Sequence, residues 1–184
     1  TRILQQDPGL DAPVQVEVGG RTIGLPVAAR DGHLVGRDSE LAHLRALLSE
    51  ALSGASRFAL VEGEPGIGKT RLQEEVAAWA LAAGATVVWG RCHDGDGAPA
   101  FWPWLEVLRR LLDALPEPER RAALTPALRQ LLDATGAGPH GPAGSLGGII
   151  AAPFALYGAI GGVLETVARR GPLVVMIDDL QWAD

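Results

Sequence analysis

The sequence predicts an α/β fold, a parallel β-sheet sandwiched by helices, and three observations carry this prediction. Short apolar runs alternate along the chain with segments of helical periodicity, as in proteins built from strand–helix units. One apolar run leads directly into a glycine-rich loop, and another ends in two aspartates. With 184 residues, of which 47% are hydrophobic, the chain is long and apolar enough to bury a core.

The first elements of this fold can be expected in order along the chain. Residues 13–32 contain short β-prone pieces broken by glycine and proline, and we interpret them as a linker. A helix is expected to start from a cap at Asp38 or Ser39, with a leucine stripe on one face and Gly54 beyond its end. Residues 58–61 form a short apolar run that predicts a buried strand.

The remaining elements follow in the same alternating order. They are a helix over 68–83, a strand over 86–89, two leucine-striped helices over about 101–115 and 126–134, a low-complexity loop over 135–148, a helix over about 153–169 and a strand over 173–177. The last strand is apolar at every position, which is typical of a strand covered on both faces. We interpret Trp102 and Trp104, at the start of the first leucine-striped helix, as packing anchors.

The glycine-rich loop carries the most specific pattern in the chain. It matches G-x-x-x-x-G-K-[ST], the phosphate-binding Walker A motif, over Gly63, Glu64, Pro65, Gly66, Ile67, Gly68, Lys69 and Thr70. Lys69 is the only lysine of the chain, whereas the other fifteen of its sixteen basic residues are arginines. A compact ammonium on a flexible stem suits the β- and γ-phosphates better than a broad guanidinium fork.

Each part of this loop has a predicted role in binding the phosphates of a nucleotide. The glycines let backbone N–H groups approach phosphate oxygens, and the helix that starts at Gly68 adds the positive end of its dipole. Lys69 would bridge the β- and γ-phosphates, the Thr70 hydroxyl would bind Mg²⁺, and we include Arg71 in the nucleotide-binding set. A chance match by a glycine-rich turn is the alternative, and the strand, helix and second motif around the loop argue against it.

The second motif is the apolar run over 173–177 followed by Asp178 and Asp179, the arrangement called Walker B. Asp178 would hold Mg²⁺ directly or through water, and Asp179 would orient or activate the attacking water. An ordinary strand that ends in a polar turn is the alternative, and the Walker A loop decides against it. We therefore predict Lys69, Asp178 and Asp179 as catalytic residues and Thr70 and Asp178 as metal ligands.

Charge and cysteine content narrow the classes of function. A net charge of −6 argues against a nucleic-acid-binding face within these residues. Cys92 is the single cysteine, so an intrachain disulfide is impossible, and a reducing cytoplasm fits. Residues 92–96 could suggest a metal site, but the ligands are crowded and no partner pair follows at zinc-like spacing, so we favour a loop.

One stretch raises the question of a membrane. Residues 143–164 contain no charge, and 158–162 read as G-x-x-x-G. A single span there would put the two nucleotide motifs on opposite sides of a bilayer. We therefore expect a buried, weakly formed helix and no membrane.

Four segments together resemble the signal-transduction ATPases with numerous domains, the STAND branch of the AAA+ group. The family pattern L-V-G-R-[DE]-x-E-L is matched at 34–41, E-G-[ED]-[PA]-G-I-G-K-T at 62–70, G-R-C at 90–92 with P-W at 103–104, and D-D-L-Q-W-A-D at 178–184. The resemblance covers about residues 33–184 and is greatest to the ATPase modules of large bacterial transcriptional regulators, either SARP-type activators or large ATP-binding LuxR-family proteins.

This resemblance implies an ATP/ADP switch with slow Mg²⁺-dependent hydrolysis in the full-length parent. In the family the V-G-R segment lies near the adenine end of the nucleotide, which here assigns Val35, Gly36 and Arg37 to nucleotide binding. The fold implied is that of the P-loop NTPases, with strand order 5-1-4-3-2. On that order the chain is truncated after the Walker B strand, and we expect it to be unstable alone, or at best a weak nucleotide binder.

The N-terminal residues suggest the context of the parent. Residues 1–12 are similar to the tail of the bacterial transcriptional activation domain that precedes such ATPase modules in SARP-type activators of actinobacteria. The expected organisation is this tail, a linker over 13–32 and the N-terminal part of an ATPase domain over 33–184. DNA would be bound only by domains absent from the chain. Nucleotide is the expected ligand, and the parent is expected to self-associate in a nucleotide-dependent way. The alternatives are a module serving a nucleotide cyclase or kinase, and a catalytically dead remnant.

Overall fold

The computed structural model describes the chain in several segments, and these fall into two compact units. The described residues are 14–18, 21–25, 36–92, 101–134 and 153–182. The units comprise Thr1–Ala83 and Gly84–Asp184. The expected domain tail over 1–12, Val35, most of the 92–96 cluster, the 135–148 loop and the last two residues of the D-D-L-Q-W-A-D segment lie outside the described residues.

The first unit contains a β-hairpin within the predicted linker. Strands β1 (Val14–Val18) and β2 (Arg21–Leu25) pair antiparallel, with Val14 opposite Leu25 and Val18 opposite Arg21. The hairpin was not predicted beyond short β-prone pieces. Its signals were the valines that alternate with polar residues and the two glycines between the strands, which are residues that a tight hairpin turn favours.

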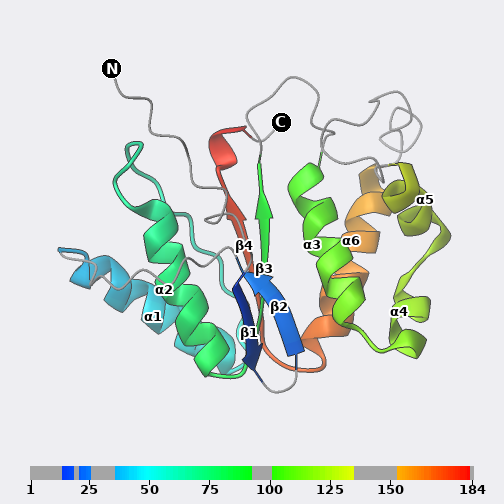
Figure 1. The fold of residues 1–184 in the computed structure, drawn as a ribbon, viewed down its shortest axis with the longest axis horizontal. Coiled ribbons are helices and arrows are strands. Elements are labelled where there is room, and N and C mark those ends of the chain that lie inside the picture. The colour runs from blue at the N-terminus through cyan, green and yellow to red at the C-terminus, as the bar shows by residue number, and fades with distance from the viewer. Residues whose placement is uncertain (1–13, 19–20, 26–35, 93–100, 135–152, 183–184) are drawn as a thin grey trace. The chain divides into compact units, whose positions relative to one another are not determined.

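Two helices make up the rest of the regular structure described in this unit. Helix α1 (Asp38–Leu52) packs beside α2 (Lys69–Ala82) (Figure 1). Between them, the Arg45 guanidinium lies 3.9 Å from the centre of the Trp79 ring. The predicted cap of α1 was wrong by a residue, because Arg37 is the cap and makes no side-chain capping bond. Asp38 instead lies in the first turn, where its negative charge interacts favourably with the positive end of the helix dipole.

The predicted strand over 58–61 is not formed. Residues 55–64 have no regular structure, and the side chains of Phe58 and Leu60 are 85% and 55% exposed. A strand is stable only when its backbone bonds to a neighbour, and the four described strands pair only as β1 with β2 and β3 with β4. This prediction was wrong because an apolar run alone does not supply that neighbour.

The second unit is built on a parallel pair of strands. Strand β3 (Thr86–Arg91) pairs with β4 (Leu173–Asp178), from Thr86 beside Leu173 to Arg91 beside Asp178. Both predicted strands are therefore confirmed, and their parallel pairing agrees with the α/β fold class. The two carboxyl ends meet at the same edge, which brings the start of the G-R-C segment beside the aspartate pair.

Helices make up the rest of the regular structure described in this unit. They are α3 (Trp102–Ala114), α4 (Glu117–Ala123), α5 (Pro126–Ala134), α6 (Pro153–Ala168) and the 3₁₀ turn η3 (Leu180–Trp182). The predictions for α3, α5 and α6 are confirmed. Helix α4 was missed because it has only seven residues, a proline in its first turn and no apolar stripe.

The core of the second unit lies between the strand pair and α3, α5 and α6. Leu105, Leu108, Leu128 and Val163 are almost fully buried, and Val88 of β3 joins the same cluster. Trp102 is buried in it too, which confirms its interpretation as a packing anchor. In Figure 1, α3 and α6 lie side by side next to the two strands.

The backbone of α3 approaches β3 closely at Gly90. A Cβ atom at this position would lie only 2.4 Å from the carbonyl oxygen of Pro103, which is far inside van der Waals contact. Glycine is therefore the residue that this close approach requires. The glycine of the G-R-C segment has a packing role that the sequence alone did not reveal.

Helix α3 also closes the outer edge of β3. The Trp89 carbonyl oxygen accepts a hydrogen bond of 2.7 Å from Arg110, and the Arg91 N–H donates one of 3.3 Å to Glu106. Alternate residues of a strand direct their backbone groups to opposite sides, and Thr86 and Cys92 direct theirs toward β4. Trp89 and Arg91 therefore lie at the open edge, where α3 side chains replace a further strand.

The uncharged stretch that raised the question of a membrane ends in α6, which has 16 residues. Across the described segments, no helix is both long and apolar enough to cross a bilayer. Residues 143–152 of the stretch lie outside the described segments.

Candidate nucleotide-binding site

The Walker A loop takes its shape from glycines in the left-handed region. Gly66 has a φ of +78° and Gly68 a φ of +96°, conformations that cost an L-residue about 1–2 kcal/mol. Between them, the Ile67 N–H donates to the Glu64 carbonyl at 3.3 Å and closes a turn. Gly68 is the cap of α2, so the loop ends at the N–H groups and positive dipole end of that helix.

Lys69 folds back over this loop. Its Nζ donates to the carbonyl oxygens of Gly63 at 3.0 Å and Glu64 at 3.1 Å. Both partners are neutral acceptors, whereas a phosphate oxygen is charged and makes a stronger bond to an ammonium. The lysine is thus held over the loop by contacts that an anion could replace.

The next two residues of the predicted set lie in the first turn of α2. Thr70 is half-buried at the second position of the helix. Arg71 pairs with Glu74 at 3.3 Å and with Glu75 at 2.6 Å, so acids of its own helix hold its guanidinium. The roles of Thr70 in binding Mg²⁺ and of Arg71 in binding nucleotide stay predictions.

The V-G-R segment reaches the Walker A loop within the same unit. Arg37 donates a hydrogen bond of 3.4 Å to the Ile67 carbonyl, and its other terminal nitrogen pairs with Glu40 at 2.6 Å. Hydrogen bonds from the Ser39 hydroxyl and from Arg37 lower the pKa of Glu40 to about 2. The described part of the predicted V-G-R site thus contacts the loop, although the two are thirty residues apart in sequence.

The aspartate pair terminates β4 in the second unit. Asp178 is buried, with 6% of its surface exposed, and Asp179 follows with a φ of +59°. This left-handed conformation is uncommon for a residue with a Cβ, although aspartate tolerates it better than most. The Asp179 N–H donates to the Asp178 carboxylate at 3.0 Å, and Gln181 donates to the Asp179 carboxylate at 3.2 Å.

Arg91 is a site residue that sequence reasoning did not single out. Its Nη2 lies 3.7 Å from Asp178 Oδ2, and its Nε lies 3.8 Å from Asp179 Oδ2. The available signal was that Arg91 lies two residues beyond the predicted strand over 86–89 and that Asp178 directly follows the one over 173–177. The register of the two strands, which makes these residues neighbours, could not be read from the sequence.

The oxygen donors of the two motifs fit Mg²⁺ chemically. Carboxylates and a hydroxyl are hard ligands, and Mg²⁺ is commonly held by one or two carboxylates together with substrate phosphates. Within the described segments, no three or more His, Cys, Asp and Glu side chains gather into an all-protein metal cage. The hydroxyl of Thr70 belongs to the first unit and the aspartates to the second, and each half is described by itself.

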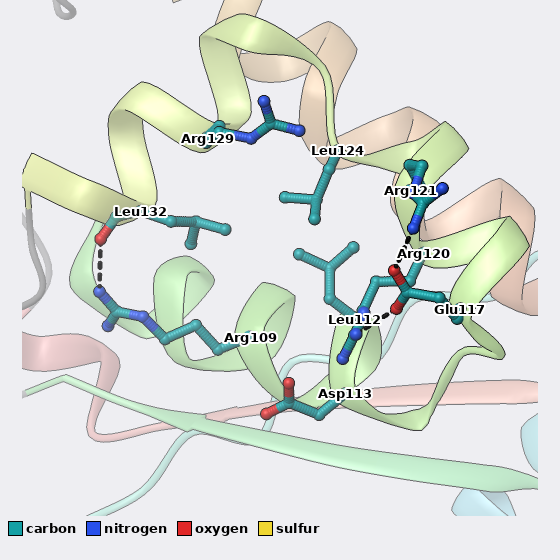
Figure 2. Close-up of a pocket in the computed structure, with 9 residues that line it drawn as sticks. All are labelled: Arg109, Leu112, Asp113, Glu117, Arg120, Arg121, Leu124, Arg129 and Leu132. Atoms are coloured by element: carbon teal, nitrogen blue, oxygen red, sulfur yellow. Dashed lines mark hydrogen bonds and ion pairs between the residues drawn. The ribbon is translucent and has the colours of Figure 1, made fainter.

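A separate hollow of about 440 Å³ lies between α3, α4 and α5 (Figure 2). Its lining contains four arginines, two acids and three leucines: Arg109, Leu112, Asp113, Glu117, Arg120, Arg121, Leu124, Arg129 and Leu132. Glu117 is held first by Arg120 and then by Arg121, and these contacts lower the pKa of the Glu117 carboxyl. None of the lining residues belongs to a Walker segment, so the hollow is not part of the candidate nucleotide site.

Comparison with known proteins identifies the family. A family model described as the AAA ATPase domain matches residues 33–184. The chain belongs to the AAA ATPase domain family. This membership supports nucleotide binding and hydrolysis, with ATP or ADP and Mg²⁺ as the cofactors that AAA ATPases generally use. The match includes the V-G-R segment, the Walker A loop and the aspartate pair.

One curated relative is a much longer protein than this chain. The sequence is 28% identical over 174 residues to the uncharacterized protein R02095 of Rhizobium meliloti (strain 1021). The aligned region covers 83% of this chain but only 16% of that protein. No solved structure matches the chain.

Proposed function

We propose that this AAA ATPase chain is the ATP/ADP-binding switch module of a bacterial transcriptional regulator, with slow Mg²⁺-dependent hydrolysis in the longer parent. The geometry of the Walker A loop carries the proposal. Left-handed glycines hold the loop at the N-terminus of α2, and Lys69 lies over it on two exchangeable carbonyl contacts. This arrangement suits a bound polyphosphate.

The chain's own residues divide the work of binding and hydrolysis. The loop N–H groups, the dipole of α2 and Lys69 would hold the phosphates. Thr70 and Asp178 would bind Mg²⁺, which neutralises charge on the phosphates when bound. Asp179 would orient the attacking water, and its left-handed backbone and the bond from Gln181 support a fixed carboxylate.

The V-G-R segment would connect the base end of the nucleotide with its phosphate end. Val35 and Gly36 are proposed to lie near the adenine, and Arg37 already bonds to the Walker A loop through the Ile67 carbonyl. A conformational change of the V-G-R segment at the adenine end would therefore be transmitted to the Walker A loop through the Arg37 side chain. This contact supports the assignment of Arg37 to the nucleotide site.

The closed outer edge of β3 supports the proposed strand order 5-1-4-3-2. Because α3 side chains occupy that edge, further strands would add only beyond β4. In this order the run over 58–61 would take the place of strand 1 in the parent, between strand 5 and the strand 4 that would lie beside β4. The exposed side chains of Phe58 and Leu60 are then surfaces that the parent buries.

The regulator context rests on the resemblance of 1–12 to an activation-domain tail and on the order tail, linker over 13–32 and ATPase domain over 33–184. The net charge of −6 supports DNA contact by other domains of the parent rather than by this chain. Self-association of the parent on nucleotide binding is part of the same proposal.

Titration with a fluorescent ATP analogue and Mg²⁺ tests the nucleotide site. The titration compares this chain, a version extended through the proposed additional strands, Lys69→Ala, and the matched control Arg57→Ala, which removes an exposed cation paired with Glu50. We expect Lys69→Ala to weaken binding by more than about tenfold, as loss of a charge-assisted phosphate contact should, and Arg57→Ala to leave it unchanged. Equal binding by the extended version with and without Lys69→Ala would overturn the proposal, whereas binding by the extended version alone would leave the site assignment standing.

A further inference from the structure

Arg91 ends β3 and lies beside the carboxylates of Asp178, which ends β4, and of Asp179, which follows it. It is the register partner of Asp178, and its guanidinium reaches both aspartates, at 3.7 Å and 3.8 Å. The side chain of Asp178 is 7% exposed and that of Arg91 is 46% exposed. One end of this ion pair is thus fixed inside the protein and the other borders on solvent.

The backbone of Arg91 is held from both sides. Its N–H donates to Glu106 of α3, and the N–H of the next residue, Cys92, donates to the Asp178 carbonyl at 3.0 Å. Only the side chain of Arg91 is left to move. The arginine is therefore tethered beside the carboxylates whether or not its guanidinium touches them.

The contacts of the guanidinium are long for an ion pair. The exposed helical pair of Arg169 with Glu165 closes to 2.6 Å, whereas both contacts of Arg91 exceed 3.6 Å. A buried carboxylate needs a cation to offset its loss of hydration, and a loose partner meets that need while remaining easy to displace.

We propose that Arg91 is a resident counter-ion of the aspartate pair, which Mg²⁺ must displace before it can bind there with nucleotide. This inference rests on the proposed nucleotide site. Mg²⁺ held by the Asp178 carboxylate would compete with the guanidinium of Arg91 for the same negative charge, so the two cations exclude each other. Arg91 is a positioning residue, which neutralises the carboxylates without Mg²⁺ and raises the Mg²⁺ concentration needed to fill the site.

The test measures the Mg²⁺ concentration that half-saturates tightening of fluorescent ATP-analogue binding. The proteins compared are the unchanged chain, Arg91→Gln, Arg91→Lys and the surface control Arg169→Gln. We expect Arg91→Gln to lower this concentration by about two- to fivefold, the range for removing a partly exposed ion pair. Arg91→Lys, which keeps the charge, should lie near the unchanged chain, as should Arg169→Gln.

The outcomes separate this inference from the proposed function. If nucleotide binds and Lys69→Ala abolishes it, but Arg91→Gln needs as much Mg²⁺ as the unchanged chain or more, the counter-ion role is wrong and the site stands. If the version extended through the proposed strands binds nucleotide alike with and without Lys69→Ala, the proposed function fails, and the counter-ion role fails with it.

Cys92 offers a second measurement in the unchanged chain, in case Arg91→Gln does not fold. This single cysteine is buried and directly follows Arg91, so the rate of its alkylation by iodoacetamide reports changes in the side chains that cover this strand end. We expect Mg²⁺ to speed the alkylation of protein already saturated with nucleotide, because the guanidinium is displaced. An unchanged rate under saturating Mg²⁺ would overturn the proposal.

Discussion

The phosphate-binding loop of the first unit takes its shape from residues that are close in sequence, whereas the carboxylate pair of the second unit depends on strands far apart in the chain. In the loop, the φ angles of Gly66 and Gly68 and the start of α2 set the geometry. At the strand ends, the parallel register of β3 with β4 and the packing of α3 set it. The first half is built by local conformation, and the second is built by the core.

The largest predicted effect is a loss of stability from a substitution in the core of the second unit. Leu108→Ala removes a side chain with 0% exposure from the cluster of the second unit and should lower the free energy of unfolding by about 2–5 kcal/mol. Leu47→Ala, at a half-buried position of α1, should cost clearly less. Urea denaturation followed by tryptophan fluorescence measures both, and equal losses would contradict a core concentrated in the second unit.

The next effect comes from the close approach of α3 to β3. Gly90→Ala places a methyl group 2.4 Å from the Pro103 carbonyl, and we expect a loss of about 1–3 kcal/mol in the free energy of unfolding. Gly161→Ala, in α6, meets nothing within 4 Å and should instead stabilise the chain by about 0.5–1 kcal/mol. Thermal unfolding of the two variants should therefore shift in opposite directions, and shifts of the same sign would show that the packing at Gly90 is misjudged.

The next predicted loss of stability is smaller, and it is accompanied by weaker nucleotide binding only when the substitution lies in the Walker A loop. Gly68→Ala forces a φ of +96° on alanine and should cost about 1–2 kcal/mol, while weakening ATP-analogue binding. Gly84→Ala carries a similar strain at +81° beyond the other end of α2. We expect Gly84→Ala to show a comparable change in stability with unchanged nucleotide affinity. If both variants lose affinity equally, the loop conformation is not what binds the phosphates.

The same contrast explains what could be predicted from the sequence. The Walker A loop was recognisable because glycine, lysine and threonine are required at fixed local spacing, and helix boundaries such as Gly84 follow from local chemistry. The predictions for β3 and β4 succeeded because each apolar run has the other as a pairing partner, which the run over 58–61 lacks among the described strands. The contact of Arg91 with Asp178 was missed because register depends on tertiary packing, which no local pattern encodes.

The predictions for residues 58–61 and for α4 failed for opposite reasons. The apolar run at Phe58 has strand propensity but no described partner strand, so propensity without pairing left it exposed. Helix α4 has no apolar periodicity, yet it forms between two longer helices, with Glu117 bonded to arginines one turn later. In both cases the surroundings decided the structure.

The smallest predicted effect compares one carboxylate in each unit at low pH. Glu40 has a pKa lowered from 4.5 to about 2, first by the Ser39 hydroxyl and then by Arg37, and the pKa of Glu117 is lowered first by Arg120. Because the folded-state pKa lies below the unfolded one, each contributes stability that is present above about pH 4.5 and is lost as the pH falls toward the folded value. Both carboxylates are exposed, so we expect slight effects on stability.

In urea denaturation between pH 5 and pH 2, Glu40→Gln should lose less stability on acidification than the unchanged chain does. ATP-analogue binding by the unchanged chain should weaken over the same range as Glu40 releases Arg37. Glu117→Gln should flatten the stability profile without changing the pH dependence of binding, and an equal effect of the two variants on binding would show that Arg37 does not connect Glu40 to the loop.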